Sequence, residues 1–416
     1  MQKFTNLEVC LINMANQALD MGKKPFAERL GITAKQVADA IEQMPDIGER
    51  LMALQSVKAY RDAQKGYFSV PIEMDTNSSM FVIQGCIMRD YDSLKYVGVS
   101  QDRPQATYKK LEASWRADCE VAGVQTDEVK DFKHDAAIPY GYCGETCVRA
   151  ALGKKGYPVF QGTFKKALPK CAEFREACLD AWDGSTLHYD WELPDAYEVS
   201  VPVLGDPKKH DIHIGNMTIG YRLTQNEPRP KWIEVKGRNG FPEYKRNNDT
   251  RSLGANITHS YDAYILREIV RRCGITYARA LEILKRCNES CHCVEEDALL
   301  ERLQKCTYET GIVSARWFYL LENNPVKLPE GISNALESMA NTLSSKSFEL
   351  IVIHDAYGCT ANHVNALRKT ANQVFADLYA GDVAKYFNRK LGIKLSPNKF
   401  DKDVYQAILG SDYLVH

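Results

Sequence analysis

Apolar and polar positions change their spacing several times along the chain, and each spacing predicts a different kind of element. Within residues 1–60, apolar side chains recur every three to four positions, which predicts amphipathic helices. A short run at 67–74 predicts a strand, and helical spacing returns over 105–151. Residues 187–240 alternate Val, Ile, Tyr and Thr between Gly, Pro and Asp turn signals, which predicts β-hairpins.

Two further segments complete this pattern. Residues 259–341 return to helical spacing, and residues 348–354, FELIVIH, form a continuous apolar run. Such a run predicts a central strand that is buried on both faces. The expected fold class is therefore α+β, rich in helices, with a small antiparallel sheet.

The composition is that of an ordinary globular protein. Of 416 residues, 44% are apolar and 26% are charged, which is enough for one large core or for two to three lobes. No apolar run approaches the roughly 18 to 20 residues that span a bilayer, and the first residues do not have the pattern of a secretory leader. The 13 irregularly spaced cysteines fit reduced thiols. We therefore expect a cytoplasmic protein that does not enter a membrane.

The net charge of −1 restricts how this chain can bind nucleic acid. Nonspecific binding to phosphates normally draws on a surplus of Lys and Arg. Local basic patches, such as 165–166, 208–209 and 231–251, or a basic partner would have to supply that charge. Each patch taken alone also fits a solvated surface.

Two aspartates each follow a predicted strand. Asp75 leads into a turn of small polar residues in MDTNSSMFVIQG (74–85), and Asp355 follows the apolar run in IVIHDAYG (351–358). Magnesium prefers oxygen ligands and keeps waters and substrate phosphates in its shell, so two carboxylates at adjacent strand ends suffice for a two-metal site. An Asp after a strand also fits a turn or a helix cap, so the pair alone leaves both roles open.

The residues around these aspartates resemble catalytic motifs of the single-subunit RNA polymerases of phages and mitochondria. His354-Asp355-Ala356-Tyr357-Gly358 resembles the third motif of that family. Asp75, Ser79 and Gln84 resemble the first motif, with Gln84 two residues later than in the family pattern and Met80 at the place of a glycine. The resemblance implies that Asp75 and Asp355 hold two Mg²⁺ ions for nucleotidyl transfer.

The second motif of the family holds the incoming triphosphate on a helix, and Lys133 with Tyr140-Gly141 resembles it. Seven residues at 100° each bring Lys133 and Tyr140 to within about 20° of one helix face, although Pro139 bends the helix between them. Lys130 shares that face and is the candidate for a second cation. Tyr108, in PQATYKK, resembles a Tyr that shapes the substrate pocket.

Three more segments occur in the order of the same family. LGANITHSYD (253–262) resembles the segment whose His reaches the nascent base pair, which implies that role for His259. WELPDAYEV (191–199) resembles the start of a specificity hairpin that reads promoter DNA, here at about 187–225. The final GSDYLVH resembles a short tail that folds back toward the active site.

The resemblance implies a right-hand polymerase fold with palm and fingers. The implied domains are 1–95 (helices and the first part of the palm), 96–258 (fingers and specificity hairpin) and 259–416 (second part of the palm and the tail). The implied catalytic residues are Asp75, Asp355, Lys133, Tyr140, His354 and His259. The implied nucleotide-binding residues are Lys130, Lys133, Tyr140, Tyr108, Gly141, Ser79 and Gln84. The implied metal ligands are Asp75, Thr76 and Asp355.

Some parts of the family pattern have no counterpart in this sequence. The thumb, the N-terminal domain and a Gly-Arg motif before the first catalytic motif are not found, and the chain resembles the larger subunit of two-subunit phage middle-gene RNA polymerases. We therefore expect a second subunit that carries the thumb and the N-terminal domain. The other expected partners are the DNA template, nascent RNA, ribonucleoside triphosphates and a recruitment protein that binds promoters or single-stranded DNA, in the cytoplasm of a bacterial host.

Two alternative functions compete with this interpretation, and a cysteine cluster raises the separate question of a zinc site. A related repair-type DNA polymerase would carry a Glu after the first Asp and a His-Asp-Glu third motif, and neither is found. Residues 25–41 fit a helix-turn-helix, which would suit a noncatalytic DNA-binding regulator. Cys287, Cys291, His292 and Cys293 have side chains that bind zinc, but they do not form two separated pairs.

Overall fold

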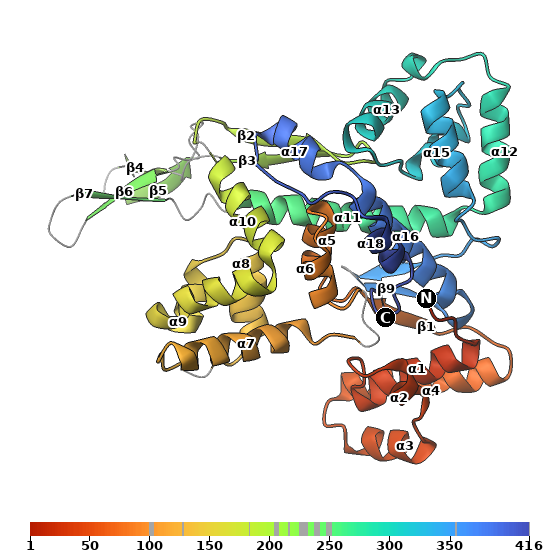
Figure 1. The fold of residues 1–416 in the computed structure, drawn as a ribbon, viewed down its shortest axis with the longest axis horizontal. Coiled ribbons are helices and arrows are strands. Elements are labelled where there is room, and N and C mark those ends of the chain that lie inside the picture. Colours follow the sequence, from red (N-terminus) through yellow and green to blue (C-terminus); the bar gives the residue numbers. More distant parts are fainter. Residues whose placement is uncertain are drawn as a thin grey trace.

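The computed structural model of this chain describes residues 1–99, 104–126, 129–182, 184–203, 208–214, 217–223, 232–236, 242–246, 252–353 and 356–415. Helices form most of the molecule, and the strands form small antiparallel sheets (Figure 1). The α+β class expected from the sequence is confirmed. No helix within these residues has the length and apolar character needed to cross a bilayer.

The first four helices follow the periodicity expected for residues 1–60. They are α1 (Asn6–Leu19), α2 (Phe26–Leu30), α3 (Ala34–Gln43) and α4 (Ile47–Gln64). Capping boxes fix two of the starts: Thr5 and Glu8 exchange hydrogen bonds at α1, and Thr33 and Gln36 do so at α3. Helices α1 and α4 pack against each other, and α3 lies over both.

A three-stranded antiparallel sheet joins the N-terminal part of the chain to its C-terminal part. It has the order β1 (Pro71–Asp75), β9 (Ala356–Thr360), β8 (Ile351–Ile353). Ile72 and Met74 of β1 point into the core, whereas Glu73 and Asp75 are exposed. One face of the sheet is therefore packed and the other is open.

The apolar run at 348–354 does not form the central buried strand that its composition predicts. Only Ile351–Ile353 are in a strand, β8 lies at the edge of the described sheet, and Ile351 and Ile353 are 55% and 59% exposed. The central strand is β9, whose Gly358 and Cys359 are weak strand signals. An apolar run does not by itself reveal whether both faces of a strand are covered.

Helix α16 (Val364–Ala380) packs against β9 of this sheet, and a group of helices around it connects the sheet to the rest of the molecule. The other helices of this group are α5 (Ser79–Ile87), α6 (Tyr91–Tyr96), α11 (Ser252–Gly274), η4 (Ala361–His363), α17 (Val383–Leu391) and α18 (Lys402–Leu409). Helices α5, α11 and α16 pack against one another and contribute to one large hydrophobic core. The long α11 runs through the middle of the molecule (Figure 1).

A second group of helices forms a lobe beside α5. It comprises α7 (Thr107–Val121), a π-helical turn η1 (Lys133–Ala137), α8 (Ile138–Gly141), α9 (Thr146–Ala167) and α10 (Pro169–Ala181). Aromatic rings fill its centre: Phe132 contacts Trp115 and Phe160, with ring centroids 5.5 and 5.6 Å apart. This lobe is the segment in which the sequence predicts the fingers.

The alternating segment forms hairpins, as expected. They pair β2 (His188–Glu192) with β3 (Glu198–Pro202), β4 (Lys208–Ile214) with β5 (Met217–Leu223), and β6 (Trp232–Lys236) with β7 (Pro242–Arg246). Strands β4 to β7 project from one side of the molecule (Figure 1). Their register confirms the prediction of β-hairpins within 187–240.

A separate helical unit follows α11 and has a hydrophobic core of its own. It consists of α12 (Tyr277–Asn288), η3 (Val294–Glu296), α13 (Ala298–Thr310), α14 (Arg316–Leu321) and α15 (Glu330–Ala340). Leu303, Trp317 and Leu336 are completely buried at its centre. Helical spacing predicts these helices, but it gives no indication of a second core.

Candidate active site

Asp75 occupies the last position of β1, on the open face of the sheet. In the antiparallel register, Asp75 lies opposite Ala356, and Ala356 lies opposite Ile353 on the other side. Ala356 is the residue that follows Asp355 in the sequence. His354 and Asp355 themselves lie outside the described residues. Strand β9, which follows Asp355 in the sequence, is thus paired with strand β1, which ends at Asp75.

The turn after Asp75 is held by the C-terminal tail. Thr76 forms a β-bridge with Val415, and the backbone N–H of Asn77 donates to the carbonyl of Leu414 at 3.0 Å. The Oγ1 of Thr76 is buried and has no hydrogen-bond partner among the described residues. The C-terminal tail therefore lies against the segment in which the sequence predicts the first motif.

Lys23 lies beside the predicted first motif, although the sequence interpretation gave it no role in the site. Its Nζ donates to Oδ1 of Asn77 at 2.8 Å, two residues after Asp75. Burial of the ammonium group lowers the pKa of Lys23; Asp75 acts in the opposite direction, and Lys133 lowers the pKa further. The ammonium group of Lys23 is therefore within electrostatic range of both Asp75 and Lys133. No local pattern marks this lysine, because 51 residues separate it from Asp75 in the sequence.

Lys133 lies at the start of the π-helical turn, and its side chain is exposed. Its Nζ lies 5.5 Å from the ring centroid of Tyr108, and the Tyr108 ring is 6.0 Å from that of Phe81 in α5. The structure thus brings together Lys133 and Tyr108, which the sequence predicts for the same pocket. Lys130 is also exposed.

The predicted common face of Lys133 and Tyr140 is not formed. Residues 133–137 are in a π-helical turn, which rotates through a smaller angle per residue than an α-helix. Pro139 lies at the start of the next short helix. The Tyr140 ring is only 4% exposed and packs 4.8 Å from Phe164, with the Arg175 guanidinium 4.1 Å from its centroid. Tyr140 therefore belongs to the core of this lobe, whereas Lys133 faces outward.

Gln84 was predicted to contact nucleotide, but its side chain is buried. Its Nε2 is 3.3 Å from the carbonyl of Gly141 and 3.3 Å from the Oγ1 of Thr258. It therefore connects α5, α8 and α11, which carry three of the predicted motifs. Gly141 fits here because a Cβ at that position would lie 2.3 Å from Cε of Met80. Ser79, at the start of α5, is half-buried.

His259 lies on α11 and stacks on Tyr142, a residue for which the sequence predicts no role. The ring centroids are 4.5 Å apart and the rings are nearly parallel, at 15°. Burial lowers the pKa of His259 below its ordinary value, which favours the neutral ring near pH 7. Tyr142, rather than Tyr140, is the aromatic residue beside the histidine.

The segment with a helix-turn-helix pattern is part of the main body. Phe26 of α2 stacks on Tyr413 of the C-terminal tail, with centroids 4.5 Å apart. Arg29 is completely buried, and its guanidinium donates to the carbonyls of Lys24 and Gly22. These contacts argue against an autonomous DNA-reading unit at 25–41.

The cysteine cluster does not form a metal site in the described part of the chain. Cys287 is buried in the helical unit, whereas Cys291 and Cys293 are exposed. His292 pairs with Glu296 at 2.9 Å. No group of three or more His, Cys, Asp or Glu side chains suited to a metal ion is found among the described residues, which do not include Asp355.

Neither the scan against protein-family models nor the search of curated proteins finds a match for this chain.

Proposed function

We propose that this chain is the catalytic subunit of a DNA-dependent RNA polymerase and performs template-directed nucleotidyl transfer. The observation that carries the proposal is the register of β1 and β9, in which Asp75 lies opposite the residue that follows Asp355 in the sequence. Two carboxylates at paired strand ends would give the close oxygen ligands that a pair of divalent ions needs.

The chemistry of the donors fits magnesium. Asp75 has an exposed carboxylate, and beside it Thr76 has a buried hydroxyl oxygen without a hydrogen-bond partner among the described residues. Together with Asp355 they form a set of hard oxygen donors. When bound, the ions would activate the primer 3′-hydroxyl and stabilise the leaving pyrophosphate.

The protein side chains would bind and orient the substrate. Lys23 lies within electrostatic reach of Asp75, and Lys23 and Lys133 can offset the charge of a triphosphate. The stacked pair of Tyr142 and His259 offers a flat face to a base pair. The Gln84 amide holds the three supporting helices in fixed relation, which keeps these groups in register.

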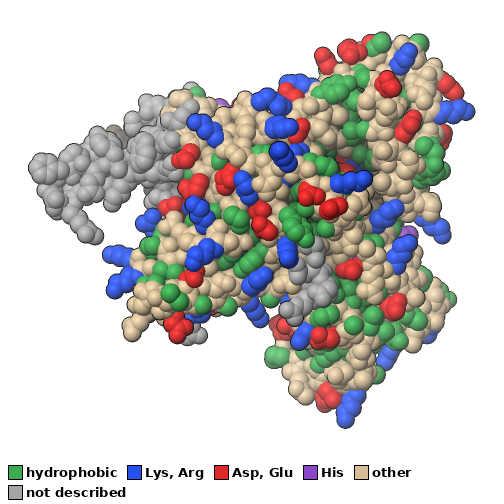
Figure 2. All heavy atoms as spheres, in the orientation of Figure 1, with side chains coloured by type: hydrophobic (Ala, Val, Ile, Leu, Met, Phe, Trp, Pro, Cys, Tyr) green, Lys and Arg blue, Asp and Glu red, His purple; other side chains and the backbone are tan. Residues whose placement is uncertain are grey.

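The partner proposed with this function is a second subunit that carries the thumb and the N-terminal part. Positive and negative side chains are mixed over most of the face in Figure 2, and the net charge of the chain is −1. A strong nonspecific affinity for the DNA template and nascent RNA would therefore have to come from a basic partner.

The experiment that tests this function measures primer extension. The chain would be purified from its native host with whatever polypeptide copurifies, and supplied with primed DNA template, Mg²⁺ and either ribo- or deoxyribonucleoside triphosphates. We expect extension with ribonucleotides by the pair of subunits and little or none by the isolated chain. Extension with deoxynucleotides only would identify a DNA polymerase, and no extension by the pair with either set would refute the proposal.

Replacing Lys23 by Met is expected to raise the KM for nucleoside triphosphates by about 10- to 100-fold. This change corresponds to the roughly 1.5–3 kcal/mol that a hydrogen bond to a charged group contributes. Steady-state primer extension at varied nucleotide concentration measures the effect. Lys24 is the matched control, because it is exposed and pairs with the neighbouring Glu28 at 3.8 Å. Equal kinetics for Lys23→Met and Lys24→Met would exclude this role of Lys23.

A further inference from the structure

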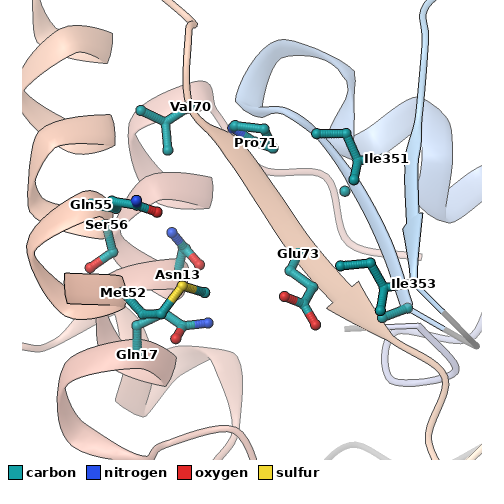
Figure 3. Close-up of a pocket in the computed structure, with 12 residues that line it drawn as sticks. Asn13, Gln17, Met52, Gln55, Ser56, Val70, Pro71, Glu73, Ile351 and Ile353 are labelled. Carbon is teal, nitrogen blue, oxygen red and sulfur yellow. The ribbon is translucent and has the colours of Figure 1, made fainter. Parts of the chain in front are cut away.

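A groove runs between α4 and the open face of the three-stranded sheet (Figure 3). We call it the sheet groove; its volume is about 270 Å³. Helices α1 and α4 contribute one wall, with Met52 and Gln55 among its residues, and the sheet contributes the other, with Glu73, Ile351 and Ile353. None of these residues was assigned a role from the sequence.

The sheet wall of the groove is apolar and hollowed. Glu73, Gly358 and Ile351 lie side by side in the register, and the next row contains Asp75, Ala356 and Ile353. The small residues in the middle leave space between Glu73 and the two isoleucines. Met52, Ile351 and Ile353 are between 41% and 59% exposed. Several exposed large apolar side chains around one groove are typical of an interaction surface.

Among the described residues that line the sheet groove, Glu73 is the one with a charged side chain. It forms no ion pair within the part of the chain that the structure describes, and its carboxylate points into the space between Met52 and Ile353 (Figure 3). The opposite wall adds the amides of Asn13, Gln17 and Gln55, which can both donate and accept hydrogen bonds. The groove therefore combines an apolar wall, a wall of amides and one negative charge.

We propose that the sheet groove binds an extended polypeptide segment of the second subunit. A Lys or Arg of that segment would lie opposite Glu73, and apolar side chains on either side of it would cover Ile351, Ile353 and Met52. The amides of Asn13, Gln17 and Gln55 would hydrogen-bond to the peptide backbone. The proposal rests on the proposed function only in naming the second subunit as the occupant.

Charge and polarity favour a polypeptide over nucleic acid in this groove. A carboxylate at Glu73 repels phosphates, and aliphatic side chains gain nothing from contact with a charged sugar-phosphate backbone. A basic side chain between apolar residues satisfies both features of the groove at once. Asp75 is not among the described residues that line the groove, so a bound segment need not cover its carboxylate.

Site-specific photo-crosslinking in the native host tests the proposal. A benzoyl-phenylalanine at Gln55 keeps Glu73 intact, and the same group at Glu120, an exposed residue of α7, serves as the control position. We expect the Gln55 position to crosslink to one segment of another polypeptide that contains a Lys or Arg. A crosslink to nucleic acid or to a second copy of this chain, or a yield no greater than at Glu120, would overturn the proposal.

Charge reversal then tests the role of Glu73. Glu73→Lys is expected to lower the crosslinking yield at Gln55 by at least about 10-fold, and reversal of the partner's basic residue is expected to restore it. Glu120→Lys is the matched control for charge, and an unchanged melting temperature shows that the variants fold. A yield that is insensitive to Glu73→Lys would contradict the proposal. Crosslinking is also measured in Asp355→Asn, the variant that tests the polymerase proposal. It should persist there, because the groove residues are unchanged, so the binding of the segment is tested separately from catalysis.

Discussion

Replacing either Asp75 or Asp355 by Asn is expected to lower the rate of primer extension by at least about 10³-fold, while nucleic acid binding is retained. Loss of one carboxylate removes a ligand from both proposed ions, and a 10³-fold effect corresponds to about 4 kcal/mol of lost transition-state stabilisation. The substitution keeps the size of the side chain, and Asp75 is exposed at the end of a strand, so folding should be little affected.

The measurement compares single-turnover primer extension and template binding for each variant and for Asp92→Asn. Asp92 is an exposed carboxylate in the first turn of α6 and serves as the matched control. Full extension by Asp355→Asn would contradict the polymerase proposal and would favour a DNA-binding protein in which the aspartates only cap turns. Loss of extension together with loss of the folded state would show a structural role instead.

Glu268→Ala is expected to lower the free energy of unfolding by about 3–5 kcal/mol, because it removes one of the two carboxylates that pair with the buried Arg272. Glu268 is completely buried, and its carboxylate accepts hydrogen bonds from Arg272 at 3.0 Å, Ser314 at 2.7 Å and the backbone N–H of Ala315 at 2.7 Å. Arg272, only 1% exposed, also pairs with Asp377 of α16 at 2.7 Å. This network connects α11, α16 and the helical unit that has its own core.

Urea unfolding followed by circular dichroism measures this loss. Glu282→Ala is the matched control, because Glu282 is an exposed carboxylate of α12 paired with Arg279; we expect a change of about 1 kcal/mol or less there. A double replacement of Glu268 and Arg272 by apolar residues of similar size is expected to be more stable than Glu268→Ala alone. Equal stability of Glu268→Ala and Glu282→Ala would show that the buried network does not stabilise the fold.

The sequence by itself determined the elements that depend on local pattern. The helices of residues 1–60, the hairpins within 187–240 and the strand before Asp75 all follow from spacing, caps and turn residues, because these signals act over a few residues. Lys133 and Tyr108 were both predicted to bind nucleotide, and the Lys133 Nζ lies 5.5 Å from the Tyr108 ring centroid. That prediction depended on a family resemblance, because no local signal connects two residues in different helices.

The tertiary structure decided which faces are covered and which distant residues meet. The apolar run at 348–354 predicts a buried strand, yet β8 lies at an edge of the described sheet. Whether other elements cover a strand depends on the neighbouring elements and not on the strand itself. A single π-helical turn altered the direction of Tyr140, and packing of three helices buried Gln84. Lys23 reaches the first motif only through the fold.

The first motif illustrates the same division. Sequence pattern alone puts Asp75 at the end of a strand, because alternation and turn residues are local. Its position opposite the strand that follows Asp355, the tail that holds Thr76, and the open groove beside Glu73 arise from segments that lie far apart in the chain, such as Thr76 and Val415. Long-range strand pairing and packing created these features, and they set the surroundings in which the carboxylate would act.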